Sequence, residues 1–128
     1  MMEQGYEGTP RSVTVGRQAN ASASVNWGYL IIWEFQIRPG METRFEQVYG
    51  PRGLWSEFFA AGKGYVGTEL VRNTKTSSSY LTLDFWTSRS AYLSFREENR
   101  QRYSEIDAEC EAMTSREVEV GSFERATG

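Results

Sequence analysis

The sequence predicts a ferredoxin-like α+β domain with the element order β-α-β-β-α-β and a four-stranded antiparallel sheet. Three observations predict this fold. Four segments read as strands, two longer segments repeat apolar residues at helical spacing, and the two middle strands are joined by a connection too short for a crossover helix. With 128 residues the chain suits one domain with one hydrophobic core.

The N-terminal part differs in composition from the rest. Residues 1–26 are rich in Gly, Ser, Ala, Thr and Asn and contain few large apolar side chains. Such a segment buries too little surface to offset the entropy lost on ordering. We therefore expect a flexible arm here and a single folded domain over residues 27–128.

The first half of this domain predicts a strand followed by an interrupted helix. Tyr29 to Ile37 forms the strand and ends at Arg38-Pro39-Gly40, because proline and glycine both terminate strands. Apolar residues then recur at helical spacing from Met41 to Tyr49. Residues 50–53 (Gly-Pro-Arg-Gly) interrupt the helix, and residues 54–61 resume it on one apolar stripe that glycine ends.

The middle of the chain predicts a hairpin. Tyr65 to Arg72 and Tyr80 to Trp86 read as strands, and the polar residues 73–79 join them. This connection leaves no room for a helix, so the two strands are antiparallel neighbours.

A long helix and a last strand complete the order. Ser88 is placed as the helix N-cap, and apolar residues behind it step by threes and fours to Met113, with a bend expected near Asn99. Residues 116–124 form the last strand, with valines on one face and acidic residues on the other, a pattern suited to a sheet edge. Both helices then cover the same face of the sheet.

The helix-free face of this sheet is expected to be apolar. The first strand carries large apolar groups on both faces, and in the third strand Leu81, Leu83 and Phe85 lie opposite Tyr80 and Trp86. Leaving such a patch in water is unfavourable by roughly 25 cal/mol per Å² of apolar surface. We therefore expect a homodimer in which a two-fold partner lays its own sheet against this face.

Charge and hydropathy exclude several classes of partner. The net charge is −3 with acidic and basic residues interspersed, so the sequence offers no basic face for nucleic acid or an anionic membrane surface. The longest apolar run, Tyr29 to Trp33, is far shorter than the roughly 20 residues of a spanning helix, and the N-terminus lacks a signal-peptide pattern. We expect a soluble cytoplasmic protein without nucleic-acid or membrane partners.

Histidine is absent from the chain, which narrows the possible chemistry. Ser-His-Asp and Cys-His catalysis, histidine-liganded zinc and histidine-ligated haem all need an imidazole as base or ligand. The single cysteine, Cys110, lies on an apolar helical seam and is expected in the core. We expect no metal and no organic cofactor, and any chemistry must use carboxylates, Tyr, Trp, Arg or Asn.

Several motifs, in this order and spacing, carry a resemblance to a known family: Arg38-Pro39-Gly40, Phe45, Gly64 to Leu70, and Asp84 to Ser88 followed by Ala91, Tyr92 and Phe95. From Tyr29 to Phe123 the chain resembles the antibiotic-biosynthesis monooxygenase domain. The resemblance implies a homodimeric α/β barrel with a pocket between the sheet and helices of each subunit. Some members of that family oxidise aromatic polyketides or quinols with dioxygen and no cofactor. Others degrade haem, typically with a histidine ligand that this sequence lacks.

Asp84, Trp86 and Arg72 are the candidate catalytic residues. Asp84 lies two residues before Trp86 and so on the same strand face, where desolvation would let its carboxylate take a proton from a substrate hydroxyl. Trp86 matches a tryptophan that borders the pocket in several family members, and the Arg72 guanidinium is able to stabilise a phenolate. The structural alternatives are a core tryptophan and an ion pair of Asp84 with Arg72 or Arg89.

Trp33, Tyr65 and Phe35 are the candidate substrate-binding residues. Trp33 and Phe35 share one face of the first strand, where family members place pocket-lining groups, and a core role is the alternative for Trp33. The Tyr65 hydroxyl is able to donate to a developing oxyanion. Tyr103 and the acidic residues from Glu105 to Glu111 lie on a helix with an apolar seam, where charges usually mark the solvated face.

The working hypothesis is a cofactor-independent monooxygenase that oxidises a small aromatic polyketide-like phenol or hydroquinone with dioxygen. The ionised substrate itself passes an electron to dioxygen, so the protein has to supply a dry aromatic cavity and a group that favours the phenolate. Two alternatives use the same cavity. One is a non-catalytic ligand-binding or accessory protein, and the other is an isomerase or cyclase that needs a base but no dioxygen.

Overall fold

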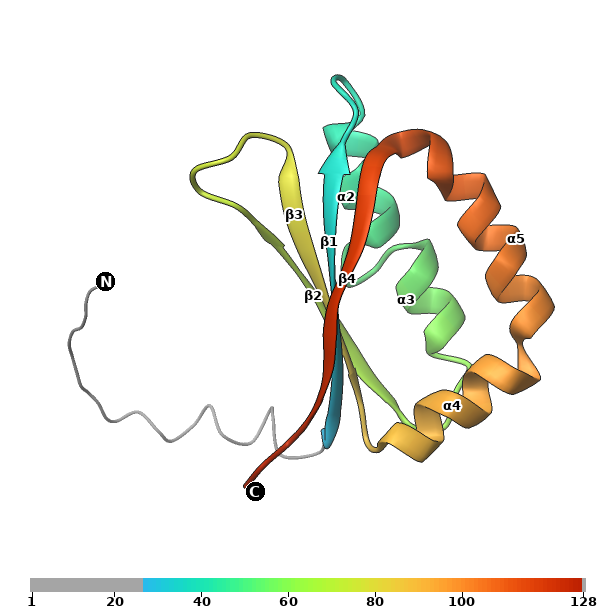
Figure 1. Cartoon of the computed structure of the whole chain (residues 1–128). Helices are drawn as coiled ribbons and strands as arrows, with labels where there is room; N and C mark the ends of the chain where they lie inside the picture. The colour runs from blue at the N-terminus through green and yellow to red at the C-terminus, as the bar shows by residue number, and fades with distance from the viewer. Residues whose placement is uncertain (1–26, 128) are drawn as a thin grey trace.

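The computed structural model describes residues 27–127, and over this range the chain forms one four-stranded antiparallel sheet with its helices on one face (Figure 1). The sequence-based prediction of a β-α-β-β-α-β fold is confirmed, with each predicted helix divided into two. The elements are β1 (Tyr29–Ile37), α2 (Glu42–Tyr49), α3 (Leu54–Phe59), β2 (Tyr65–Arg72), β3 (Ser79–Trp86), α4 (Arg89–Glu98), α5 (Arg100–Cys110), the 3-10 turn η2 (Glu111–Met113) and β4 (Thr114–Glu124). The expected flexible arm, residues 1–26, lies outside the described residues.

The strand order is β2-β3-β1-β4, so the first and third strands are central and the last strand is an edge, as predicted. β1 pairs antiparallel with β3, which brings Ile31 opposite Asp84. On its other side β1 pairs with β4, with Phe35 opposite Glu117 and Trp33 opposite Glu119. The register of this second pair shifts between Ile32 and Trp33, a bulge that bends the edge strand.

The core lies between the sheet and the helices. On β1 every second residue faces the helices, since side chains alternate between the faces of a strand. Tyr29, Ile31, Phe35 and Ile37 are buried there and Trp33 is partly buried. Aromatic rings from the helices complete the core, and the largest fully buried side chains are Trp86, Phe45, Ile37 and Ile106. Cys110 is buried in the same core, as predicted.

The interruption of the first helix follows from its glycines. At Gly53 a Cβ atom would lie 2.2 Å from the Val48 carbonyl oxygen, so the turn between α2 and α3 admits no side chain there. The Ser56 hydroxyl, in the first turn of α3, donates to the Gly50 carbonyl at 2.9 Å and holds the turn closed. The apolar stripe therefore continues across two short helices, as predicted.

The bend in the second helix lies at the predicted residue. Asn99 leaves helical geometry (φ −122°, ψ 27°), and its side-chain amide donates to the Phe95 carbonyl at 2.9 Å. Figure 1 shows α4 and α5 running in different directions from this point, so that both lie over the sheet. Ser88 caps α4 by accepting from the Ala91 amide at 3.1 Å. The helix ends at Cys110 rather than at Met113, because the chain tightens into η2 before β4.

The helix-free face of the sheet carries apolar side chains, as predicted. Leu30, Leu83 and Phe85 are half-buried there, while Val71 is 43% and Phe123 45% exposed. No helix in the described part of the chain is long and apolar enough to cross a bilayer.

Candidate functional site

A cavity of about 330 Å³ lies between the helix-covered face of the sheet and the helices. Its lining comes from β1, β3 and β4 on the sheet side and from α2, α3, α4 and α5 on the other side. This is the location that the sequence predicted. A cavity of this size is in the range of small-molecule sites.

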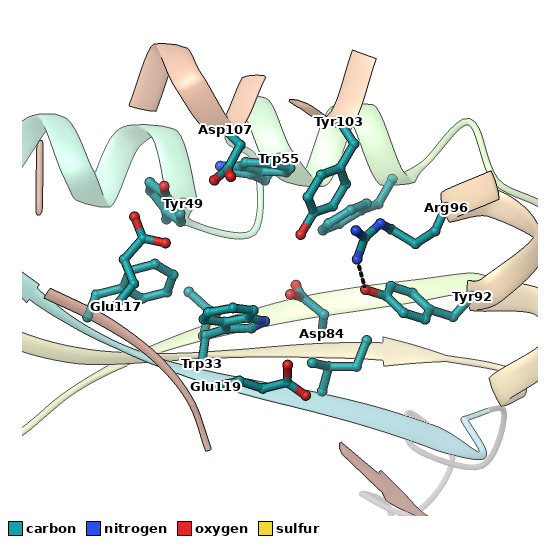
Figure 2. Close-up of a pocket in the computed structure, with 14 residues that line it drawn as sticks. Trp33, Tyr49, Trp55, Asp84, Tyr92, Arg96, Tyr103, Asp107, Glu117 and Glu119 are labelled. Carbon is teal, nitrogen blue, oxygen red and sulfur yellow. Dashed lines mark hydrogen bonds between the residues drawn. The ribbon is translucent and has the colours of Figure 1, made fainter. Parts of the chain in front are cut away.

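Aromatic rings form most of the wall. On the sheet side Trp33 stacks on Phe35, with ring centroids 6.3 Å apart and an interplanar angle of 27°. On the helix side Trp55 meets Tyr103 edge to face at 5.0 Å. Figure 2 shows Trp33 and Tyr103 on opposite sides of the cavity. Faces of this kind suit a flat aromatic ligand.

Asp84 projects from β3 into the cavity between these walls (Figure 2). The Thr68 hydroxyl on the neighbouring strand donates to Asp84 Oδ1 at 2.6 Å. The Tyr65 hydroxyl lies 2.6 Å from the same Thr68 oxygen. Because Thr68 has a single hydroxyl proton and donates it to Asp84, Tyr65 is the donor to Thr68. Two hydrogen bonds therefore run in series toward the carboxylate.

Burial in this site raises the pKa of Asp84 to about 6, although the hydrogen bond from Thr68 lowers it. At neutral pH the carboxylate is then mostly ionised. It is also a stronger base than an ordinary aspartate, since its pKa lies closer to the pH of the solution.

Arg96 supplies the positive charge of the cavity from α4. Its guanidinium donates from Nη1 to the Tyr92 hydroxyl at 2.7 Å, and its Cζ lies 3.7 Å above the centre of the Tyr103 ring. These two contacts fix a planar cation beside the aromatic wall. Arg96 forms no ion pair with a carboxylate within residues 27–127, so its charge is open to a ligand.

Three carboxylates line the cavity farther from Arg96. Asp107 comes from α5, and Glu117 and Glu119 come from β4. All three residues are exposed to solvent. Thr114 Oγ1 donates to Glu117 Oε2 at 3.1 Å. Partial burial raises the pKa of Glu117, and the negative charge of Asp107 adds to this rise.

The cavity includes three of the six residues proposed from the sequence, namely Trp33, Phe35 and Asp84. Their shared strand face explains the agreement, because residues two apart on β1 and on β3 point the same way.

Trp86 and Tyr65 lie behind the cavity wall rather than in it. Trp86 is fully buried, 5.4 Å from the Tyr65 ring and 5.3 Å from the Phe95 ring. Its indole N–H has no acceptor among the described residues. Trp86 therefore packs as a core residue, the structural alternative that the sequence left open. Tyr65 reaches the site through its hydrogen bond to Thr68 and its ring contact with the lining residue Phe59.

The structure does not bring Arg72 to the cavity. Its guanidinium pairs with Glu46 at 3.1 Å on the surface and lies 5.8 Å from the centre of the Tyr80 ring. The alternative ion pair of Asp84 with Arg72 or Arg89 does not form either, because Thr68 is the partner of Asp84.

Sequence reasoning did not single out Arg96 or Trp55 as candidates, and it treated Asp107 as solvated. The signal for Arg96 was its spacing, since it lies four residues after Tyr92 and four residues bring two side chains together on a helix. Asp107 lies four residues after Tyr103 in the same way. Glu117 and Glu119 were interpreted only as the acidic face of an edge strand, and that face borders the cavity.

The described residues contain no group of three or more Cys, Asp or Glu side chains placed to hold a metal ion. The chemistry that this chain offers at the cavity is a carboxylate base, a guanidinium and aromatic surfaces.

Solved structures with the same fold include SnoaB, a cofactor-independent oxygenase from Streptomyces nogalater, with a TM-score of 0.61 at 19% identity over 80% of this chain and 96% of that one. PA3566 from Pseudomonas aeruginosa matches with a TM-score of 0.56 at 18% identity over 79% of this chain and 96% of that one. The haem degrader MhuD from Mycobacterium tuberculosis matches with a TM-score of 0.54 at 15% identity over 78% and 97% of the two chains. At identities this low the likeness shows a shared fold.

No curated protein sequence matches the chain. The family model described as "Antibiotic biosynthesis monooxygenase" matches residues 28–103, which include β1, β3 and the cavity residues Asp84 and Arg96. The chain therefore belongs to the antibiotic biosynthesis monooxygenase family.

Proposed function

We propose that this protein is a cofactor-independent monooxygenase that oxidises a small aromatic phenol or hydroquinone with dioxygen. One observation carries the proposal: a carboxylate with a raised pKa, Asp84, and a guanidinium without a carboxylate partner, Arg96, face the same aromatic-walled cavity. This combination provides a base for a phenolic proton and a cation for the phenolate that results.

Asp84 is the general base in this proposal. It takes the proton of the substrate hydroxyl, and its raised pKa makes the transfer less unfavourable than it would be to an ordinary aspartate. Arg96, fixed by Tyr92 and Tyr103, lies beside the oxygen that becomes negative and stabilises the phenolate. We assign to Arg96 the role that the sequence suggested for Arg72.

The oxidation balances without a cofactor when the ionised ring carries a CH₂ group in conjugation with the oxygen. The anion passes one electron to dioxygen, and the resulting superoxide joins the ring radical at carbon to form a C–O bond. The peroxide anion takes back the proton that Asp84 removed, and the resulting hydroperoxide loses water and leaves a new carbonyl. Carbon loses four electrons and dioxygen gains four, with one oxygen atom retained in the product and one released in water. Trp33 and Trp55 hold the ring and exclude bulk water during these steps.

Two observations favour this function over its rivals. A protein that only binds its ligand needs no ionisable group in the cavity, whereas Asp84 and Arg96 both face it. A haem-degrading activity of the MhuD kind is disfavoured because the chain has no histidine to ligate iron and because four carboxylates line the cavity, where they would repel haem propionates. An isomerase or cyclase would use the same base, and dependence on dioxygen separates it from the monooxygenase.

We also propose that the protein acts as a homodimer joined through the helix-free sheet faces. The half-exposed Val71 and Phe123 support this arrangement, since a second sheet would cover both. The cavity lies on the opposite side of the sheet and stays accessible in such a dimer.

The test is oxygen uptake by the purified protein with a panel of hydroxyanthrone, hydroxynaphthacene and hydroquinone compounds, in the presence of a metal chelator. Labelled dioxygen should place one oxygen atom in the product. Asp84→Asn should lower the rate at least about a hundredfold, the usual loss for a general base, and Arg96→Gln should also lower it. Arg89→Gln on the same helix removes a charge outside the cavity lining and should not change the rate. No uptake with any compound, or equal rates in all variants, would overturn the proposal.

A further inference from the structure

The lining charges of the cavity are predominantly negative. Arg96 lies at one end, beside Tyr92, and Asp107 and Glu117 lie toward the other end, with Glu119 below them (Figure 2). Asp84 lies between Arg96 and Glu117, and the Glu119 carboxylate lies below Asp84 in this view. Four carboxylates and one guanidinium therefore face a ligand, so negative charge is in excess in the lining.

The register of the edge strand explains the acidic end. Glu117 and Glu119 are two residues apart on β4, opposite Phe35 and Trp33 of β1, so both side chains lie on the helix-covered face beside the aromatic wall. Asp107 reaches the same end from α5. All three residues are exposed, whereas Arg96 is partly buried. The acidic end is therefore the solvent-facing end of the cavity.

Within residues 27–127 no salt bridge joins Asp107, Glu117 or Glu119 to a cation, although Asp107 lies within electrostatic range of Arg96. Arg102, a cation on α5, pairs with Glu105 and Glu109. Glu117 accepts a hydrogen bond from Thr114, which fixes its position but leaves its charge. A ligand group at this end therefore meets negative potential, which repels an anion and attracts a cation.

We infer that the protein takes a neutral or amine-bearing phenol, bound with the phenolic end toward Arg96 and Asp84, and that Asp107, Glu117 and Glu119 select against carboxylated analogues. The placement of the phenolic end rests on the proposed function. The selection by charge concerns binding alone and stands apart from turnover.

Titration calorimetry with three dihydroxyanthraquinones tests this inference. The compounds share one ring system with both hydroxyls on one outer ring. They differ only in the group on the other outer ring, which is a carboxylate, a hydroxymethyl or an aminomethyl group. The wild-type protein should bind the aminomethyl compound at least about tenfold more tightly than the carboxylated one at low salt, because opposite charges a few ångströms apart change affinity by such factors. The ratio should shrink at high salt, since salt screens exposed charges.

Two matched double variants identify the residues responsible. Glu117→Gln with Glu119→Gln removes two charges from the acidic end and should reduce the ratio severalfold. Glu57→Gln with Glu98→Gln changes the net charge equally at exposed positions outside the cavity lining and should leave the ratio unchanged.

Equal or tighter binding of the carboxylated compound would overturn the inference, as would the same ratio in both double variants or no binding of any compound. Oxygen uptake with the matching hydroxyanthrones is measured in parallel. A charge preference without oxygen uptake would sink the proposed function and leave the selectivity standing. Oxygen uptake without a charge preference would support the proposed function and overturn the selectivity.

Discussion

Replacing Asp84 by asparagine should stabilise the folded protein at neutral pH while it removes the proposed base. The pKa of Asp84 rises from 3.8 to about 6 on folding, so the folded state holds the proton more tightly than the unfolded state does. The cost of keeping the carboxylate ionised is absent well below pH 4, grows between about 4 and 6, and is complete above about 6. A rise of about 2 in the pKa corresponds to a loss of roughly 3 kcal/mol in the free energy of unfolding when the carboxylate is ionised.

Asparagine removes this cost and keeps an oxygen that accepts the hydrogen bond from Thr68. We expect Asp84→Asn to raise the free energy of unfolding by about 1–3 kcal/mol at pH 7.5 and by much less at pH 4. Urea unfolding followed by tryptophan fluorescence at both pH values measures this difference.

The matched control is Asp107→Asn, the same substitution at an exposed residue of the cavity end, where we expect a change within about 0.5 kcal/mol. A variant at residue 84 that is less stable than the wild type at pH 7.5 would refute the reasoning. So would a gain of equal size at pH 4, because a gain that does not depend on pH has another cause.

Three further predictions concern the surroundings of the site. Thr68→Val removes a hydrogen bond to the ionised Asp84 that is worth about 1.5–3 kcal/mol, so the acidic limb of the pH–rate profile should move up by about 1–2 pH units. Thr68→Ser keeps the hydrogen bond and should leave the limb in place. An unshifted limb in Thr68→Val would show that Thr68 does not act on Asp84. Trp86→Phe should cost about 1–3 kcal/mol in thermal unfolding and change kcat only severalfold, because Trp86 is core; a large loss of kcat in a stable variant would restore it to the site. Sedimentation should give twice the chain mass of 14.6 kDa for the wild-type protein. Phe123→Asp places a charge on the helix-free face and should give a monomer. A monomeric wild-type protein would rule out the dimer.

The fold was predictable because its signals are local. Alternation along β1, the glycines between α2 and α3, and the cap at Ser88 each depend on neighbours within a few residues. The bend at Asn99 was predictable for the same reason, since the asparagine side chain competes for the backbone of its own helix. The start of β4 at Thr114 was missed, because it depends on pairing with Ile37 far back in the chain.

The site was only partly predictable. Strand faces follow from a period of two, so the sequence grouped Trp33 with Phe35 and Asp84 with Trp86 correctly. Alternation between the two faces of a strand does not show how far along the strand the cavity extends. Trp86, at the end of β3, therefore shares a face with Asp84 but lies in the core. Arg96 lies four residues after Tyr92 on α4, but whether this face of the helix borders the cavity depends on how α4 packs over the sheet, which no local pattern encodes.

The pH dependence of oxygen uptake tests the central claim most directly, namely that Asp84 is the base that ionises the substrate. With a hydroxyanthrone that the wild-type protein oxidises, the rate should rise with pH through a midpoint near 6, the pKa of Asp84, because only the ionised carboxylate takes the proton. In Asp84→Asn this limb should disappear, and the remaining slow rate should follow the ionisation of the phenol itself. A wild-type rate that does not change between pH 5 and 8, or an Asp84→Asn variant that keeps both the rate and the limb, would contradict the account.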